Sequence, residues 1–209
     1  MSLSTWLAFF VASWLISLSP GAGAISCMAA GMRYGYARGL WNVFGLQLGI
    51  LFVLAIVAAG LGAVLAASSV AFATVKWLGV GYLIWLGVQQ WRAPARPLAD
   101  TDGANDRASR RDLVVRGLLV NATNPKGILF MLAVLPQFID PARPQLAQYG
   151  ICAATLAFTD LIVMSAYTGL ASRLLAALRE PHHIRIVNRT FGGLFVAAGA
   201  ALAAFRRAA

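Results

Sequence analysis

Long apolar runs separated by short polar stretches form the dominant pattern of this chain. Residues 1–32 and 39–75 contain no charged side chain, and each run exceeds the roughly 20 residues that a helix needs to cross a bilayer core about 30 Å thick. The runs are continuous and do not alternate with a period of two, as the strands of an outer-membrane barrel would. The pattern therefore predicts an all-α polytopic membrane protein with six transmembrane helices. The predicted spans are residues 4–30, 40–66, 72–91, 113–137, 147–170 and 188–205.

The composition supports a membrane protein and excludes soluble classes of protein. Of the 209 residues, 60% are hydrophobic and 11% are charged. Soluble domains have roughly 45–50% apolar and about 25% charged residues, so this chain cannot cover a soluble fold with polar side chains. The net charge of +10 would suggest nucleic acid in a soluble protein. Here the cations lie between apolar runs, and no basic domain remains to bind nucleic acid.

The basic residues that flank the spans predict the orientation. Twelve arginines lie in the first, third and fifth loops, whereas three lie in the second and fourth loops and the C-terminal tail. Because basic residues favour cytoplasmic loops, we expect the odd loops in the cytoplasm and both termini in the periplasm. Arg206 and Arg207 in the tail point to the opposite orientation.

The six spans divide into two halves of three within a single transmembrane domain. Residues 1–91 form the first half, residues 92–112 form a cytoplasmic linker, and residues 113–209 form the second half. An odd number of spans in each half gives the two halves opposite orientations in the membrane. The layout therefore predicts two inverted three-helix repeats.

Each half begins with a span that contains a proline. Pro20 lies in the sequence Ser-Pro-Gly-Ala-Gly of residues 19–23, and Pro125 lies in Asn-Pro-Lys-Gly of residues 124–127. Proline removes a backbone donor, and the carbonyls that it frees are tolerated at membrane depth only beside protein donors or a wet cavity. Interrupted helices at corresponding positions of two inverted halves indicate a transporter site near the midplane. The alternative is that each proline only kinks its helix.

Two charged residues lie deep in the second half of the chain. Asp160 lies midway along the fifth span, and Lys126 follows the proline of the fourth span. Charges inside a membrane are costly and usually functional. In one interpretation, Asp160 takes up and releases protons while Lys126 and the N-terminus of a half-helix attract a carboxylate. In the other, the two residues form a buried ion pair that holds spans four and five together.

Other polar residues in the spans are candidates to line the same cavity or to form interhelical hydrogen bonds. We expect cavity roles for Gln47 and for Tyr167, which lies two turns after Asp160 on one helix face. Hydrogen bonds between helices are expected for Asn42 and Asn121. Small residues at two positions in the second span, Gly45 and Gly49, predict close helix packing. Two buried cysteines, Cys27 and Cys152, are expected as small core residues, and the adjacent His182 and His183 lack the partners that a metal site needs.

Several motifs in order resemble the LysE/RhtB family of bacterial inner-membrane amino-acid exporters. Residues 19–23 are similar to the family's S-P-G-P-G signature, with Ala22 in place of the second proline. Residues 116–127 are similar to its G-x-x-x-N-x-x-N-P-K-A motif, and residues 135–138 match the L-P-Q-F that follows. The resemblance covers essentially the whole chain. It departs from many members at Ile50, where they carry an acidic or hydroxyl residue.

The resemblance implies export of amino acids or close derivatives across the inner membrane, driven by the proton gradient, and no enzymatic activity. One ammonium and one carboxylate could meet Asp160 and the Lys126 half-helix, and no second buried carboxylate is available for a dibasic amino acid. The sequence therefore favours neutral substrates such as threonine, homoserine or its lactone. The alternatives are an exporter of basic amino acids and an uncoupled channel or scaffold.

The expected partners are the small-molecule substrate, protons and the lipid bilayer, and a homo-oligomer is left open. We expect no cofactor, no metal ion and no catalytic residue. The residues expected on the substrate and proton pathway are Pro20, Gly21, Gly23, Gln47, Asn124, Pro125, Lys126, Asp160 and Tyr167.

Overall fold

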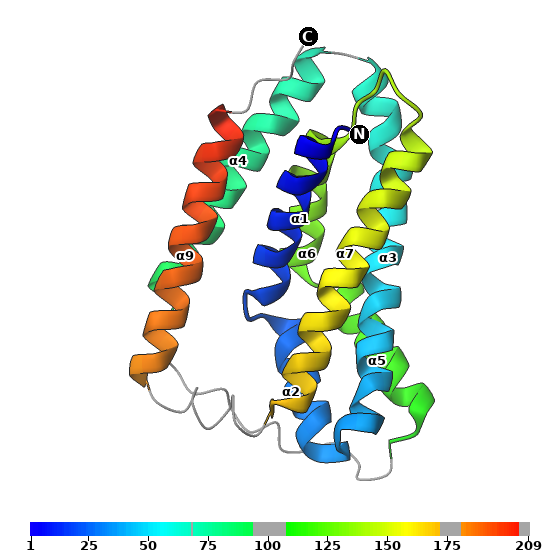
Figure 1. Ribbon diagram of the computed structural model, residues 1–209, viewed down its shortest axis with the longest axis vertical. Coiled ribbons are helices and arrows are strands. Elements are labelled where there is room, and N and C mark those ends of the chain that lie inside the picture. The colour runs from blue at the N-terminus through cyan, green and yellow to red at the C-terminus, as the bar shows by residue number, and fades with distance from the viewer. Residues whose placement is uncertain (68, 94–107, 172–180, 205–209) are drawn as a thin grey trace.

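The computed structural model describes residues 1–67, 69–93, 108–171 and 181–204, and the regular structure within these ranges is helical (Figure 1). The helices are α1 (Leu3–Leu18), α2 (Ala22–Tyr34), α3 (Tyr36–Ala67), α4 (Ser69–Arg92), α5 (Arg110–Ala122), α6 (Pro125–Ala133), the short 3-10 helix η1 (Leu135–Phe138), α7 (Gln145–Gly169) and α9 (Pro181–Ala204). Each of the six predicted spans coincides with one helix or with a broken pair, which confirms the all-helical architecture.

Two of these helices are long and apolar enough to cross a membrane alone. They are Tyr36–Gly60 of α3 and Gln145–Gly169 of α7. The pairs α1–α2 and α5–α6 raise the number of candidate spans to four if each bent pair counts as one span. The full count of six spans and the inverted repeat stay predictions.

The two expected breaks are present. The α1–α2 pair bends by 55°, and the pair formed by Arg110–Ala122 and Pro125–Phe138 bends by 50°. At the first break, Pro20 cannot donate to the carbonyl four residues earlier, so α1 stops at Leu18. At the second, Pro125 occupies the first turn of α6, where an amide hydrogen is not needed, and Asn124 is the N-cap.

Both breaks lie in the interior of the helix bundle. In Figure 1, α1 runs from one end of the molecule to the middle and α2 continues to the other end, while α5 and α6 run in the reverse direction. The first residues of α1 and the last residues of α9 lie at the same end. One apolar core spans both halves and contains Phe9, Leu83, Met131, Leu156 and Phe195.

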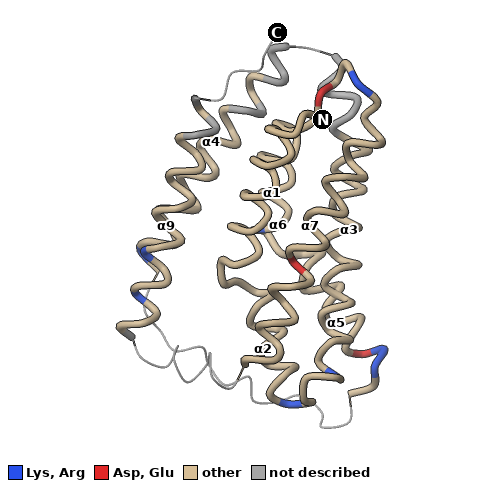
Figure 2. Tube along the Cα trace, viewed as in Figure 1, with Lys and Arg blue, Asp and Glu red and all other residues tan. Residues whose placement is uncertain are grey.

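The described basic residues gather mainly at the opposite end of the molecule. Figure 2 shows them at the end of α2, the start of α5 and the start of α9, whereas Arg143 lies with Asp140 in the loop before α7. The charge asymmetry predicted from the loops is therefore present among these residues. Most of the predicted linker lies outside the described residues, as do Arg96, Arg107, Arg173, Arg179, Arg206 and Arg207.

Glycines set the closest contacts between helices. A Cβ on Gly45 of α3 would collide with the Val114 carbonyl of α5, and one on Gly49 would lie 2.6 Å from the Leu118 carbonyl oxygen. The predicted packing role of these two glycines is confirmed. The reciprocal pair Gly87 and Gly192 joins α4 to α9 in the same way.

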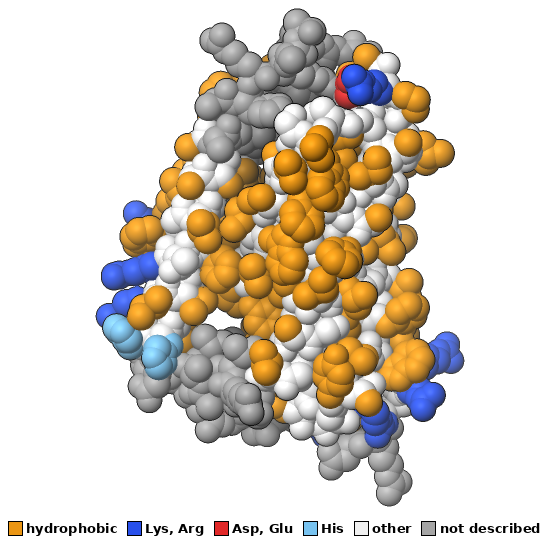
Figure 3. Space-filling model, in the orientation of Figure 1, with side chains coloured by type: hydrophobic (Ala, Val, Ile, Leu, Met, Phe, Trp, Pro, Cys, Tyr) orange, Lys and Arg blue, Asp and Glu red, His pale blue; other side chains and the backbone are white. Residues whose placement is uncertain are grey.

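The outer surface of the bundle is apolar. In Figure 3, hydrophobic side chains cover the visible face of the central helices along most of their length. Large side chains such as Phe52, Ile56 and Phe158 are more than half exposed. Contiguous exposed apolar surface of this extent is typical of a protein that contacts lipid.

Candidate functional site

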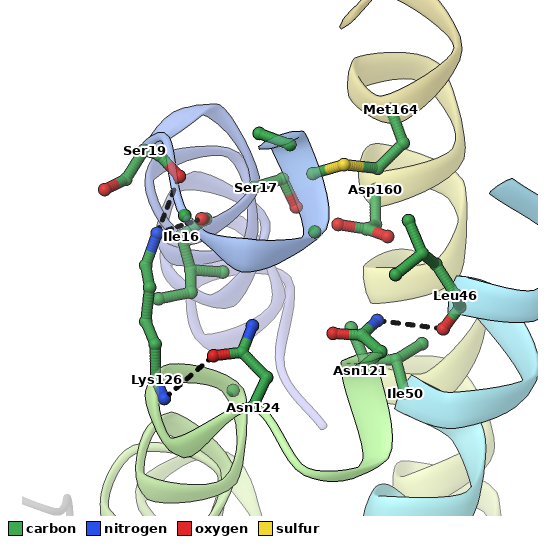
Figure 4. A pocket seen from close by; sticks show the side chains of 14 residues that line it. Ile16, Ser17, Ser19, Leu46, Ile50, Asn121, Asn124, Lys126, Asp160 and Met164 are labelled. Atoms are coloured by element: carbon green, nitrogen blue, oxygen red, sulfur yellow. Dashed lines mark hydrogen bonds between the residues drawn. The ribbon is translucent and has the colours of Figure 1, made fainter. Parts of the chain in front are cut away.

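A small internal cavity lies where the two helix breaks meet (Figure 4). Its walls come from the α1–α2 break, α3, the α5–α6 break and α7. The cavity measures about 50 Å³, which is room for a few water molecules and far less than the roughly 300 Å³ of a small-molecule site. A ligand larger than a few water molecules therefore requires the cavity to widen.

Lys126 crosses from the second break to the first. Its Nζ donates hydrogen bonds to the carbonyl oxygens of Ser19, at 2.6 Å, and Ile16, at 3.2 Å (Figure 4). The Ile16 carbonyl is the one that would have accepted from residue 20 in a continuous helix, and Pro20 has no amide hydrogen. The Lys126 ammonium therefore supplies the donor that Pro20 lacks, and it lies at the negative C-terminal end of α1.

Asp160 is buried on α7 and faces the cavity. One oxygen of its carboxylate accepts a hydrogen bond from Gln47 Nε2 at 2.8 Å, and its side chain is 6% exposed. Asp160 and Lys126 attract each other electrostatically but do not form a direct salt bridge with each other. The structure therefore does not contain a direct ion pair between Lys126 and Asp160, although both side chains line one cavity.

Ser17 and Ser19 bring two unexpected hydroxyls to the cavity. Ser17 is 3% exposed and Ser19 is 2% exposed; Ser19 Oγ has no hydrogen-bond partner among the described residues, and the Ser17 hydroxyl has only the Asp160 carboxylate nearby to interact with. The Ser17 side chain points toward the Asp160 carboxylate (Figure 4). The sequence analysis missed both serines, although polar residues just before a proline break in an apolar span were an available signal.

The two half-helix N-termini differ. The Asn124 side chain caps α6 by accepting from the Lys126 amide at 3.1 Å. In α2, the N-cap is Gly21, and no side chain caps the helix. Gly21, Gly23 and Ala24 line the cavity, so the uncapped positive end of α2 lies at the site.

The remaining predicted residues take supporting positions. Tyr167 does not line the cavity; its hydroxyl donates to the Leu18 carbonyl at the end of α1, at 2.7 Å. Asn42 bonds Ser26 between α3 and α2, which confirms its interhelical role. Asn121 donates to the Leu46 carbonyl and also borders the cavity.

Metal ligands are not grouped at this site. Among the residues that the structure describes, no three His, Cys, Asp and Glu side chains lie close enough together to hold a metal ion. Cys27 and Cys152 are buried free thiols, as expected of core residues. The cavity combines one carboxylate, one lysine ammonium that is bonded to two carbonyls, two serine hydroxyls and one uncapped helix end.

Comparisons with known proteins agree with the resemblance found in the motifs. The model of the family described as LysE type translocator matches residues 14–205. The chain is 43% identical over 208 residues to a homoserine/homoserine lactone efflux protein of Salmonella typhi, with 100% of both chains covered. It is 28% identical over 204 residues to a leucine efflux protein of Enterobacter sp. (strain 638), with 96% of this chain and 95% of the relative covered. No solved structure gives a significant match.

Proposed function

The chain belongs to the LysE type translocator family, and from this membership we propose that it exports homoserine, its lactone or a similar small neutral amino-acid derivative in exchange for protons. A family member of this kind is a transporter and not an enzyme. The observation that carries the proposal is the placement of buried Asp160 beside the uncapped N-terminus of α2, in one cavity formed by both helix breaks.

The cavity chemistry supports an amino-acid substrate. Asp160 is the carboxylate among the residues that line the cavity, and it suits an α-ammonium group. The free amides in the first turn of α2 suit a carboxylate or an ester carbonyl. Lys126 already donates to two carbonyls of α1, so we assign the acyl end of the substrate to α2.

The cavity also argues against the two alternative functions, an exporter of basic amino acids and an uncoupled channel. A dibasic amino acid would need a second carboxylate, and the residues that line the cavity include none beyond Asp160. A cavity of about 50 Å³ is too small for an amino acid, so the protein must change shape to admit one, as a carrier does, whereas a channel needs a continuous path. We therefore favour a neutral substrate and a carrier.

The proposed proton coupling is based on competition between a proton and the substrate ammonium for the Asp160 carboxylate. An ionised carboxylate binds an ammonium, whereas a protonated one does not attract it. If Asp160 releases the substrate outside when it accepts a proton and loses that proton inside, one proton enters for each substrate that leaves. The residues proposed on this path are those expected from the sequence. Gly21, Gly23, Asn124, Lys126 and Asp160 line the cavity, Gln47 donates to Asp160 without lining it, and Tyr167, Pro20 and Pro125 shape the breaks.

We also propose that the chain crosses the inner membrane six times as two inverted three-helix halves. The reverse directions of the α1–α2 and α5–α6 pairs support this arrangement, and so does the position of the first residues of α1 and the last described residues of α9 at the same end of the bundle. The basic residues at the other side support a cytoplasmic location for that side. Both termini are then periplasmic.

Export from loaded cells tests the function. Cells that express the protein are loaded with homoserine, and the external concentration is followed with and without an uncoupler. We expect export to stop with the uncoupler and to be absent in Asp160→Asn, while Asp140→Asn, in an exposed loop, exports normally. Downhill efflux that is unchanged by the uncoupler and by Asp160→Asn would favour the channel.

A further inference from the structure

We infer that Tyr82 of α4 and Phe195 of α9 are positioning residues for Lys126, and that they keep the cavity narrow by holding its ammonium on the carbonyls of α1. Neither side chain lines the cavity, so each acts through Lys126. The inference concerns how the cavity widens, and it rests on the proposed function only because a substrate must enter there.

The helices α4 and α9 form a closely packed pair at one edge of the bundle (Figure 1). A Cβ on Gly87 would lie 2.7 Å from the Gly192 carbonyl oxygen, and a Cβ on Gly192 would lie 2.7 Å from that of Gly87. Gln90 Nε2 also donates to Asn188 Oδ1 at 2.9 Å. Because the two backbones touch and a hydrogen bond joins them, we expect α4 and α9 to move as one unit.

The pair reaches the main chain of α6 through α4. A Cβ on Gly79 would collide with the carbonyl of Ala133, the last residue of α6. Tyr82 lies three residues later, on the same helix face, and its hydroxyl donates to the Lys126 carbonyl oxygen at 3.3 Å. The α4 helix therefore contacts both ends of α6, and its contact with the first turn is at Lys126 itself.

The pair also reaches the Lys126 ammonium, through α9. Lys126 Nζ lies 5.9 Å from the centroid of the Phe195 ring, which is 2% exposed. An aromatic ring attracts a cation within about 6 Å of its centroid, and the attraction is strongest away from water. The same ammonium donates to the carbonyls of Ile16 and Ser19, so one cation links α9 to the broken end of α1.

The broken end of α1 forms one wall of the cavity, which Ile16, Ser17, Ser19 and Gly21 line. The Lys126 stem lies against Gly21, where an added Cβ would be 3.5 Å from Lys126 Cδ. While Lys126 bonds to two carbonyls of this wall, the wall stays attached to α6. A movement of α4 and α9 that withdraws Lys126 would free the wall and widen the cavity. Loss of the Tyr82 or Phe195 contact should therefore favour the wider form.

The rate at which a cysteine in the cavity reacts with a thiol reagent tests the inference. Ala24 lines the cavity and is 1% exposed, so Ala24→Cys places a small reporter there. Full-length protein in proteoliposomes is treated with a water-soluble methanethiosulfonate in the absence of substrate, and the rate is corrected for the protein without the reporter. Tyr82→Phe should raise this rate about two- to tenfold, which is the effect of one neutral hydrogen bond. Phe195→Leu should raise it about two- to thirtyfold, which is the effect of one cation–ring contact away from water.

Two variants elsewhere in the same apolar core serve as controls. Tyr149 is buried, and its hydroxyl has no hydrogen-bond partner among the described residues, so Tyr149→Phe should leave the rate unchanged. Phe9 is as buried as Phe195, and its ring packs against that of Phe138 with 5.2 Å between centroids. Phe9→Leu should therefore lower the melting temperature as Phe195→Leu does, but leave the labelling rate unchanged. Equal rates in the two leucine variants would indicate a general loosening of the core and would overturn the inference.

Lys126→Met shows whether the two contacts act through the ammonium. In this background, Phe195→Leu and Tyr82→Phe should not raise the rate further, because no ammonium remains to be held. Effects that multiply in the double variants would overturn the inference. A trifluorinated phenylalanine in place of Phe195 keeps the ring shape but removes the negative charge of its face, so it should act like Phe195→Leu. A wild-type rate with this ring would overturn the role of Phe195.

Homoserine transport gives a separate measurement. A larger fraction of protein with a wide cavity should lower the KM for homoserine in Tyr82→Phe and Phe195→Leu by up to the same factor as the labelling rate rises. A lower maximal rate at constant KM would indicate a purely structural role and would contradict the inference. Unchanged labelling in both variants overturns the inference and leaves the export function intact. Labelling that changes as expected in a protein that moves no homoserine supports the inference and overturns the proposed function.

Discussion

Replacement of Lys126 by methionine tests how the first broken helix is held. The methionine stem fills nearly the same space, but it removes the ammonium that donates to the Ser19 and Ile16 carbonyls. Both carbonyls then lie at the end of α1 in the bundle interior. Since Pro20 has no amide hydrogen, the helix cannot recover the Ile16 bond by itself.

The magnitude follows from these two hydrogen bonds. A hydrogen bond to a charged group contributes about 1.5–3 kcal/mol, so the pair contributes about 3–6 kcal/mol before other terms. Removing a buried cation returns part of its desolvation cost, and hydrogen bonds between membrane helices have a measured maximum of about 1.7 kcal/mol each. We therefore expect Lys126→Met to lose about 1–3 kcal/mol of stability. At about 2–4 °C per kcal/mol, the melting temperature should fall by about 2–12 °C.

Thermal unfolding of the purified protein measures this loss, and Tyr167→Phe is the matched comparison. Tyr167 donates one neutral hydrogen bond to the Leu18 carbonyl of the same helix end, so its removal should cost about 0.5–1.5 kcal/mol. Lys126→Arg retains the positive charge, so its melting temperature should be closer to that of the wild type than the melting temperature of Lys126→Met. If Lys126→Met has the melting temperature of the wild type, or if Tyr167→Phe lowers the melting temperature more than Lys126→Met does, the ammonium does not stabilise the end of α1.

Three further changes test the packing, the cavity and the entry to α5. Gly45→Ala should lower the free energy of unfolding by about 1–3 kcal/mol, because its methyl group meets the α5 backbone. Gly60→Ala has open space around its Cβ and should lower it little. Similar melting temperatures for the two variants would contradict this. Gly23→Ala places a methyl group at ordinary contact distance, 3.7 Å from the nearest side-chain atom, so the variant should fold normally. Because Gly23 lines the cavity, the variant should export homoserine more slowly than the wild type. An unchanged export rate would show that the cavity is not on the substrate path. Hydrogen bonds from the Ser109 backbone and side chain hold the pKa of Asp112 below its usual 3.8, so its stabilising effect on α5 should be full above that pH and be lost as the pH falls further. The protection factors of the first-turn amides of α5, which are exchange rates corrected for the intrinsic rate at each pH, should therefore fall on acidification, and Asp112→Asn should remove this pH dependence.

Local rules explain what could be predicted from the sequence. The helices follow from apolar runs of membrane length, and the breaks follow from the missing amide hydrogens of Pro20 and Pro125. The close approach of α3 to α5 follows from Gly45 and Gly49, which lie on one helix face. Each of these features depends on residues within a few positions of one another, so the sequence carries them directly.

The partners of the buried polar side chains depended on the tertiary structure. The sequence placed Lys126 and Asp160 near one site, but only the packed helices direct Lys126 to the carbonyls of α1 and Gln47 to Asp160. The sequence also did not show which half-helix N-terminus lacks a cap: the Asn124 side chain caps α6, and no side chain makes a capping hydrogen bond to α2. These choices depend on the depth and rotation of helices far apart in the chain. The sequence by itself determined that this is a helical membrane protein with two broken helices, and the tertiary structure alone decided which buried polar groups are paired and which are not.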